Sequence, residues 1–258
     1  MSENIVSFNN VSMFFGGVKA IDSLSFSVEK DQIFGIIGPN GAGKTTVFNV
    51  LSGMYIPTSG EVRYREKTIN RLPPHIVTAS GIARTFQNIK LFEQQSVLEN
   101  LKVARYSQIR YGLLDVFLNS RKKIREEEEI DADCLEILKF LNLADKAAVK
   151  AGSLPYGEQR RVEIARALSC KPEVLLLDEP AAGMNHFEID ALNELIVNIR
   201  KHFSLTILLV EHQMRLVMGI SNEIMVMNFG KKMALGDPVS IRNNDDVLEA
   251  YLGKVKTT

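Results

Sequence analysis

Apolar and polar residues alternate along the first third of the chain, which is the pattern of half-buried strands. An unbroken apolar run predicts a fully buried strand over residues 33–37, and the stretch that follows it predicts a helix over 46–51. Further strands are predicted over residues 5–11, 24–28, 61–64 and 82–86. The first third is therefore expected to be rich in β-structure.

The middle of the chain has a different pattern, because residues 96–143 carry no strong strand signal. Its charge run at 121–133, RKKIREEEEIDAD, is interpreted as the solvated face of a helix. Leu135, Leu138 and Leu141 are predicted to continue that helix with an apolar stripe. We expect a helical subdomain that is inserted into an α/β domain.

The last third returns to alternating strands and helices. Strands are predicted over 174–177, 205–210 and 223–229, and helices over 190–202 and 212–220. Strands that alternate with helices imply a parallel core sheet.

Composition narrows the class of protein. Of the 258 residues, 45% are hydrophobic, which is enough for a sizeable core. The formal net charge is zero, so no overall positive potential favours a nucleic-acid partner. The N-terminus MSENIVSFNN does not resemble a signal peptide, and the apolar runs are too short to span a bilayer. Membrane work is therefore expected to go through a partner. Cys134 and Cys170 are interpreted as free thiols.

The stretch GPNGAGKT at residues 38–45 matches the phosphate-loop pattern G-x-x-x-x-G-K-[ST], between the buried strand and the predicted helix. Its glycines allow backbone N–H groups to converge on an anion, and the helix N-terminus adds positive potential. Lys44 supplies a full charge for phosphates, and the Thr45 hydroxyl is a ligand for magnesium. The nucleotide-binding candidates are Gly38, Pro39, Asn40, Gly41, Ala42, Gly43, Lys44, Thr45 and Thr46.

Two further segments place polar residues at the ends of predicted core strands. VLLLDE ends in Asp178, which can hold magnesium through water, and Glu179, which can orient or deprotonate the attacking water. His212 follows the strand at 205–210 and is a candidate contact for the γ-phosphate. The carboxyl edge of a parallel sheet is where such proteins bind ligands, so we expect these side chains to meet there.

The stretch SLPYGEQRRVEIARAL, at residues 153–168, resembles the signature sequence of ATP-binding-cassette (ABC) ATPases. With the other motifs, the resemblance covers nearly the whole chain in the family's order. It implies an α/β P-loop (RecA-like) nucleotide-binding domain with an antiparallel β subdomain and an inserted α-helical subdomain. The implied single domain spans 1–258, with the α/β core and β subdomain at 1–89 and 166–235, the helical signature subdomain at 90–165, and a C-terminal tail at 236–258.

The resemblance also implies roles for individual residues, with ATP and Mg²⁺ as cofactors. Phe15 aligns with the aromatic residue that stacks on adenine, and Gln87 with the glutamine that touches magnesium and links to the membrane partner. Glu179, His212 and Gln87 are the implied catalytic residues, and Thr45, Gln87 and Asp178 the implied metal contacts. The signature acts on the nucleotide of a second cassette and comprises Leu154, Pro155, Tyr156, Gly157 and Glu158.

Two positions depart from the family pattern. Pro155 replaces the usual serine and lacks both a hydroxyl and an N–H, and Asn185 replaces the usual aspartate of the dimer-contact loop. The helix over 158–168 is expected to begin at Gly157 and to turn Arg160 and Arg161 outward. The weakened signature favours pairing with a different ATPase, with a homodimer as the alternative.

Within the family, segments such as FFGGVKAIDSLSFSV and RTFQNIKLFEQQSVLENL resemble the larger ATP-binding subunit of bacterial branched-chain amino-acid importers. That resemblance implies an ATPase at the cytoplasmic face of the inner membrane, attached peripherally to two permease subunits through residues 90–92. It also implies a second ABC ATPase and a periplasmic solute-binding protein. A urea or amide importer cassette, a lipopolysaccharide-export cassette and a soluble non-transport ABC ATPase are the alternatives.

Overall fold

The computed structural model describes residues 3–252 and divides the chain into two compact units. The first unit combines the chain up to Val77 with the chain from Glu173 onward, and the second is Thr78–Pro172. The family resemblance implies the corresponding boundaries at 89/90 and 165/166. Residues 253–258 of the expected C-terminal tail lie outside the described residues.

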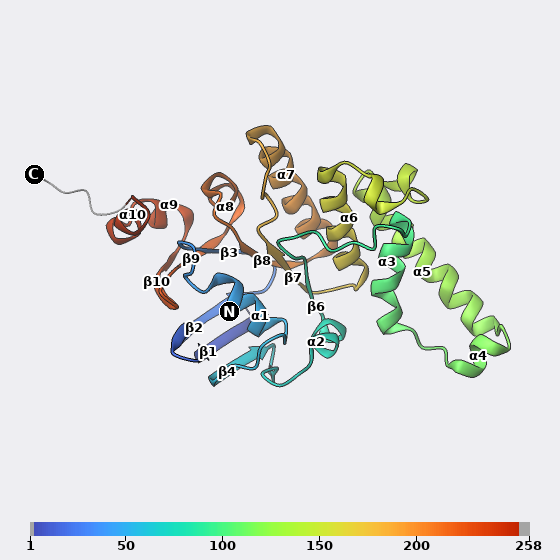
Figure 1. Cartoon of the computed structure of the whole chain (residues 1–258), viewed down its shortest axis with the longest axis horizontal. Helices are drawn as coiled ribbons and strands as arrows, with labels where there is room; N and C mark the ends of the chain where they lie inside the picture. Colours follow the sequence, from blue (N-terminus) through green and yellow to red (C-terminus); the bar gives the residue numbers. More distant parts are fainter. Residues whose placement is uncertain (1–2, 253–258) are drawn as a thin grey trace, which may run out of the picture. The chain divides into compact units, whose positions relative to one another are not determined.

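The first unit contains a mixed sheet whose strands run in the order β10-β9-β3-β8-β7 (Figure 1). Its strands are β3 (Ile33–Ile37), β7 (Val174–Asp178), β8 (Thr206–Val210), β9 (Glu223–Asn228) and β10 (Lys231–Gly236). Neighbouring strands are parallel except for the β9–β10 pair. Every residue of β3, β7 and β8 is buried, which explains why these strands have unbroken aliphatic runs.

Helices follow the carboxyl ends of the three central strands. They are α1 (Lys44–Leu51) after β3, α7 (His186–Phe203) after β7 and α8 (Met214–Ile220) after β8. After the hairpin of β9 and β10, the described part of the chain continues through α9 (Pro238–Arg242) and α10 (Asp245–Leu252) (Figure 1). The expected parallel α/β core is therefore present, with each loop between strand and helix at the same edge of the sheet.

A second, antiparallel sheet in this unit has the order β2-β1-β4-β5. Its strands are β1 (Asn4–Phe15), β2 (Val18–Glu29), β4 (Ser59–Tyr64) and β5 (Lys67–Thr68). Phe26 of β2 stacks on Phe8 of β1 at 4.6 Å and on Phe34 of β3 at 5.5 Å between ring centroids. This aromatic stack joins the two sheets across a shared apolar interior.

The second unit is mainly helical. Its elements include β6 (Ile82–Arg84), α3 (Val97–Arg105), α4 (Leu113–Phe117), α5 (Arg121–Phe140) and α6 (Tyr156–Ser169), with short 3-10 turns at Tyr106–Gln108, Ala144–Lys146 and Ala151–Ser153. Helix α2 (Pro74–Ser80) crosses the boundary between the units. None of the helices that the structure describes is both long enough and apolar enough to cross a membrane.

Every predicted strand overlaps an observed one, but the apolar stripe expected on α5 is wrong at one position. Leu135 is 41% exposed, whereas Ile130, Cys134, Ile137 and Leu138 are buried. The buried positions are separated by three, four, seven and eight residues, as on one face of a helix with 3.6 residues per turn. A strict spacing of three residues drifts around that helix, so Leu135 turns toward solvent.

The two cysteines give a first test of the buried core. Both are free thiols in the interior of the second unit, and burial raises the pKa of Cys134 to about 11 and also raises the pKa of Cys170. We expect the native protein to react with a disulfide reagent such as DTNB at neutral pH at least ~100-fold more slowly than the unfolded chain, because the thiolate is the reacting species. Rapid reaction of both thiols without denaturant, measured by absorbance, would contradict this burial.

Candidate functional site

The loop after β3 is held against two other strands at positions where only glycine fits. Gly38 has φ +155°, and a Cβ there would lie 2.2 Å from the Met227 carbonyl oxygen. Gly43 has φ +100°, and its Cβ would lie 2.2 Å from the Ala20 carbonyl oxygen. Because backbone rather than flexible side chains lies so close, neither position accepts a larger residue. The loop is thus fixed between β2 and β9.

Helix α1 begins at Lys44, two residues before the predicted start, and its N-terminus is not capped by a side chain. Gly43 occupies the capping position in a left-handed conformation, and glycine has no side chain that could accept hydrogen bonds from the first N–H groups of the helix. The N–H groups of the first helical turn lack intrahelical partners by geometry, and the helix dipole adds positive potential at this end. The loop and α1 therefore form a site that favours an anion.

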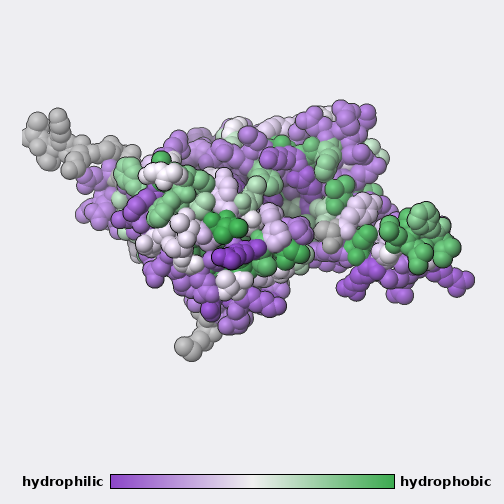
Figure 2. All heavy atoms as spheres, turned by 60° about the horizontal axis from the view of Figure 1, so that its bottom comes forward, coloured by the Kyte–Doolittle hydropathy of each residue, from purple (hydrophilic) through white to green (hydrophobic). Residues whose placement is uncertain are grey.

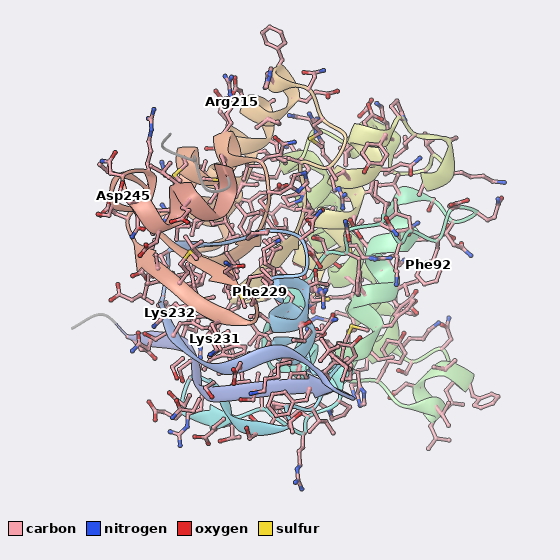
Figure 3. All side chains as sticks on the ribbon, turned by 60° about the vertical axis from the view of Figure 1, so that its left-hand side comes forward. Phe92, Arg215, Phe229, Lys231, Lys232 and Asp245 are labelled. Carbon is pink, nitrogen blue, oxygen red and sulfur yellow. The ribbon has the colours of Figure 1, made fainter. Side chains whose placement is uncertain are left out.

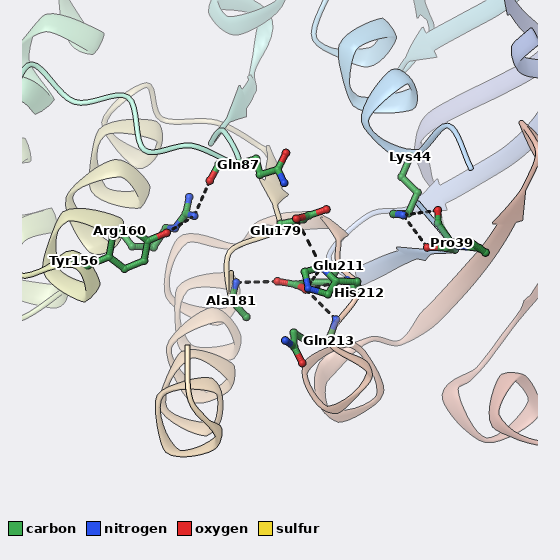
Figure 4. A network of polar contacts seen from close by, with 11 residues as sticks. Pro39, Lys44, Gln87, Tyr156, Arg160, Glu179, Ala181, Glu211, His212 and Gln213 are labelled. Atoms are coloured by element: carbon green, nitrogen blue, oxygen red, sulfur yellow. Dashed lines mark hydrogen bonds and ion pairs between the residues drawn. The ribbon is translucent and has the colours of Figure 1, made fainter. Parts of the chain in front are cut away.

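Lys44 lies inside this loop and is only 6% exposed. Its Nζ donates hydrogen bonds to the carbonyl oxygens of Gly38 at 2.7 Å and Pro39 at 3.0 Å (Figure 4). Burial lowers the pKa of Lys44, while the carboxylates of Glu179, Asp178 and, more weakly, Glu211 oppose that change. The first unit thus concentrates acidic groups around a buried cation at the carboxyl edge of its sheet.

The acids come from the end of β7. Asp178 is its last residue and is 2% exposed, and Glu179 follows in a left-handed conformation with φ +45°. The Glu179 N–H donates to the Val210 carbonyl at 2.9 Å, so the neighbouring strand fixes this conformation. A left-handed conformation is costly for a residue with a side chain, and such residues cluster at functional sites.

His212 lies beside Glu179, as the positions of both residues after neighbouring strands suggest. Its Nδ1 is 3.6 Å from Glu179 Oε2 and 3.8 Å from Glu211 Oε2, and its side chain is 47% exposed (Figure 4). The imidazole therefore lies close to the partly buried Glu179 carboxylate and the fully buried Glu211 carboxylate and is also open to solvent.

Glu211 is a site residue to which the sequence assigns no role. It is fully buried and accepts hydrogen bonds from the backbone N–H groups of Ala181 at 2.8 Å, His212 at 2.9 Å and Gln213 at 3.0 Å (Figure 4). One carboxylate thereby joins the loop after β7 to the loop after β8. The signal that could have revealed it is positional, because Asp178 and Val210 are paired in register and Glu211 therefore follows its strand as Glu179 does.

Two other predicted positions of the first unit have clear local structures. Phe15 ends β1, is 43% exposed and meets Tyr55 edge to face with ring centroids 5.2 Å apart, so part of the ring stays open to a ligand. Asn185 caps α7, and its Oδ1 accepts from the N–H groups of Phe187 and Glu188. An aspartate would cap the helix in the same way, so the substitution is neutral for α7 itself.

The second unit carries the signature residues at the start of α6. The helix begins at Tyr156, one residue before the expected Gly157, and Pro155 caps it only through its carbonyl, which accepts from Glu158 N and Gln159 N. A Cβ on Gly157 would meet nothing within 4 Å, so packing within this chain does not require glycine there. Tyr156 is 51% exposed and Leu154 is buried, which leaves an open backbone surface at the helix start.

Arg160 corrects the expectation of two outward arginines. Its side chain is 1% exposed and donates to the Phe86 carbonyl oxygen at 2.8 Å. It also donates to the Gln87 carbonyl oxygen at 2.9 Å (Figure 4). Glu163, equally buried, pairs with Arg160 at 2.8 Å and accepts from the Phe86 N–H at 3.2 Å. The guanidinium turns inward because the irregular backbone around Gln87 has buried polar groups that need partners.

The predicted site residues thus fall into two groups. The first unit brings together the phosphate loop with Lys44, Asp178, Glu179 and His212 at one sheet edge, with Phe15 at the end of β1. The second unit ties Gln87 through its backbone to the helix that begins with the signature. A buried lysine in a glycine loop before a helix, facing acids at the carboxyl edge of a parallel sheet, defines a P-loop nucleotide-binding protein.

Comparison with known proteins identifies the family. Residues 21–182 match the family model described as ABC transporter, and the chain belongs to that family. A protein of Escherichia coli K12 named as the high-affinity branched-chain amino acid transport ATP-binding protein LivG is 44% identical, over 98% of this chain and all of that one. The similarly named BraF of Pseudomonas aeruginosa is also 44% identical over the same shares.

Solved structures agree with this assignment. An ATP-binding cassette of an ABC transporter in its ADP conformation has a TM-score of 0.85 and 32% identity, covering 98% of this chain and all of that one. A nucleotide-free cassette has a TM-score of 0.84 and 31% identity, covering 97% of this chain and all of that one. The predicted family and fold class are confirmed, and the chain is an ATP-binding cassette with the ATPase activity of its family.

The buried ion pair in the second unit gives a test of the corrected site. We expect Arg160→Ala to lower the free energy of unfolding by about 3–5 kcal/mol, because it leaves the Glu163 carboxylate buried without its partner. Arg161→Ala is the matched control, since that half-exposed side chain makes no ion pair with the described residues, and its expected change is below ~1 kcal/mol. Urea unfolding followed by circular dichroism measures both, and equal midpoints for the two variants would contradict the role of the pair.

Proposed function

We propose that the chain is the ATP-hydrolysing subunit of an importer for branched-chain amino acids. The observation that carries this proposal is the 44–45% identity, over 98% of this chain and the full length of the relatives, to proteins named for that transport in Salmonella typhimurium and Escherichia coli. Archaeal proteins named as probable branched-chain amino acid transport ATP-binding proteins also match, at 33–37% identity. These similarities favour this substrate class over the urea or amide importers, lipopolysaccharide export and non-transport ATPases.

ATP is proposed to bind with its base on Phe15 and its phosphates in residues 38–46. The partly exposed Phe15 ring offers a face for stacking at the end of β1. The glycine loop supplies N–H donors, and Lys44 exchanges its two carbonyl partners for phosphate oxygens. Glu179 and His212 lie at the same edge of the sheet as Lys44. The terminal phosphate that Lys44 binds would therefore lie close to both side chains.

The donor groups of the site fit Mg²⁺ as the second cofactor. Mg²⁺ prefers oxygen ligands and uses one or two carboxylates together with substrate phosphates. The exposed Thr45 hydroxyl and the buried Asp178 carboxylate are such donors in the first unit, and Gln87 is the proposed third contact. When bound, the ion would neutralise charge on the phosphate oxygens.

Hydrolysis is proposed to use Glu179 as the group that orients and deprotonates water. Its strained backbone and its neighbour His212 place a carboxylate and an imidazole side by side. His212 then stabilises the charge that develops on the terminal phosphate. Glu211 positions both loops by its three backbone hydrogen bonds, so we assign it a positioning role rather than a catalytic one.

The signature residues are proposed to complete the nucleotide site of a second cassette. The first N–H groups of α6 and the open surface at Tyr156 and Gly157 suit a phosphate that approaches from outside the chain. Pro155 supplies neither a hydroxyl nor an N–H to that phosphate. We therefore favour a partner ATPase that differs from this chain and contributes the stronger signature.

The remaining partners of the proposed complex are two membrane permeases and a periplasmic solute-binding protein, with this subunit on the cytoplasmic face of the inner membrane. Residues 90–92 are the proposed permease contact. Phe92 is 50% exposed at the surface of the second unit (Figure 3), and Lys90 lies over the Phe86 ring at 4.7 Å. Arg160 of α6 donates hydrogen bonds to the Phe86 and Gln87 carbonyls. A movement of the permease contact at residues 90–92 would therefore be transmitted to the helix that begins with the signature.

The proposed role of Glu179 has a sharp test. We expect Glu179→Gln to retain ATP binding and to lower kcat at least ~100-fold, because the amide cannot accept the water proton. Binding of a fluorescent ATP analogue and phosphate release measure the two properties. An ATPase rate near that of the wild type would remove Glu179 from this role.

The proposed transport function is tested by uptake. Deletion of the gene is expected to abolish high-affinity uptake of radiolabelled leucine, isoleucine and valine, and expression of the wild-type chain to restore it. Lys44→Ala should fail to restore uptake, because the phosphates lose their buried cation. Uptake that continues unchanged after deletion, or a defect confined to another solute, would overturn the substrate class.

A further inference from the structure

Helices α3, α6 and α7 each have a glutamate at their third position. In α3 and α7 the N–H of the capping residue donates to this glutamate, at 2.7 Å and 2.8 Å respectively, which closes a capping box. In α6 the third residue is Glu158, but the capping residue is Pro155, which has no N–H to donate. The carboxylate of Glu158 therefore cannot be held in the way that the other two are.

Lys146 supplies the donor that Pro155 lacks. This lysine ends the short 3-10 turn at Ala144–Lys146, and its ammonium group donates to Glu158 Oε1 and forms an ion pair with it. The other carboxylate oxygen, Oε2, is buried and has no hydrogen-bond partner among the residues that the structure describes. The charge of Glu158 is therefore compensated through Lys146.

This ion pair is only partly open to water. Hydrophilic residues cover much of the face that Figure 2 shows, and water screens charges that are exposed on such a surface. The side chains of Lys146 and Glu158 are only 32% and 24% exposed. Without Lys146, the Glu158 carboxylate would therefore place a poorly screened negative charge at the start of α6.

The other charged residues near Glu158 in the chain do not take over this compensation. Arg160 is buried and is paired with Glu163 at 2.8 Å. Arg161 is half-exposed and makes no ion pair with the described residues, although it follows Glu158 by three positions on the same helix. Asp145, in the 3-10 turn, is exposed and likewise has no ion-pair partner among the described residues. The charge at the start of α6 therefore depends on one ion pair.

A negative charge at this place bears directly on the proposed role of the signature. The first N–H groups of α6 and the helix dipole give a positive potential that suits the phosphate of a second cassette's nucleotide. An unpaired carboxylate in the same turn would repel that phosphate, because both are anions. Pro155 offers no hydroxyl or N–H that could offset the repulsion.

We propose that Lys146 is a positioning residue of the signature, which holds and neutralises Glu158 so that the start of α6 can accept the phosphate of a second cassette's nucleotide. The inference rests on the proposed function, in which the signature completes the site of the partner ATPase. Lys146 acts through Glu158 and the potential at the helix start, so it is not a catalytic residue.

Removal of the cation is the first test. The complex isolated from membranes through a tag on this chain supplies paired cassettes, and its ATPase rate is measured at saturating ATP. Lys146→Ala should lower that rate at least ~10-fold, because a carboxylate then faces the incoming phosphate. Lys146→Arg keeps the charge and should retain most of the rate. Binding of a fluorescent ATP analogue to the isolated chain should not change in Lys146→Ala, because the phosphate loop belongs to the first unit and Lys146 to the second.

Rescue by a second substitution separates this role from a structural one. Lys146→Ala with Glu158→Gln should restore the rate to that of Glu158→Gln alone, because the amide needs no counter-charge. Lys146→Ala with Asp145→Asn is the matched control, since it removes the same charge from the exposed neighbour and should not restore the rate. High salt should narrow the difference between the wild type and Lys146→Ala, because it screens the repulsion. Urea unfolding followed by circular dichroism gives the stability of each variant.

Several results would overturn the inference. They are a wild-type rate in Lys146→Ala, an equal rescue by Asp145→Asn and by Glu158→Gln, or a loss of rate that follows the urea midpoints and does not respond to salt. Each of these leaves the leucine-uptake test of the proposed function unaffected. If the chain instead shows no ATP-dependent pairing, either with another ATPase or with a second copy, the proposed role of the signature fails and the inference fails with it.

Discussion

The parallel register of β3, β8 and β7 is the constraint on which the site depends. Asp178 is paired with Val210, and Val210 is paired with Ile36 just before the phosphate loop. Three strands therefore end at the same level, and the residues that follow them converge although they are far apart in the chain. Any slip of one strand by one residue would turn its buried aliphatic side chains to the other face and would separate the acids from Lys44.

Buried charge holds the loops at this edge in fixed positions. Glu211 accepts three backbone N–H groups from two loops, and Lys44 donates to two carbonyls of its own loop. In the second unit, Arg160 and Glu163 do the same for the backbone at Phe86 and Gln87. In both units the backbone of an irregular, functional segment is satisfied by charged side chains that lie in a helix or directly after a strand, because loops lack the ladder partners that strands and helices provide. Such networks keep a loop that must contact phosphate or a partner from collapsing into other conformations.

Local pattern predicted the elements well wherever burial follows periodicity. The strands of the core have unbroken aliphatic runs because both faces of a parallel sheet are covered, and the loop at 38–45 carries its own steric requirement in Gly38 and Gly43. The pattern was insufficient where a side chain forms hydrogen bonds with backbone groups that lie far away in the sequence. A charged residue on a helix is ordinarily solvated, so Arg160 was expected to face outward. Its neighbours in the sequence do not indicate that it donates hydrogen bonds to the carbonyls of residues 86–87. Leu135 is a different case, because the helical period of 3.6 residues per turn itself places this side chain away from the buried face.

The sequence by itself determined that the protein is a P-loop nucleotide-binding protein, because the residues of the phosphate loop and the acids after β7 carry their chemistry in local backbone geometry and residue type. The signature stretch indicated the family through its resemblance to known members. The sequence also determined the core strands, since hydrophobic burial acts on short runs of residues. Only the tertiary structure decided that Glu211 joins two loops, that Arg160 is buried, and that the side chains of α4 remain uncovered. These properties depend on which distant backbone groups and surfaces come to lie beside a residue, and neither spacing nor composition contains that information.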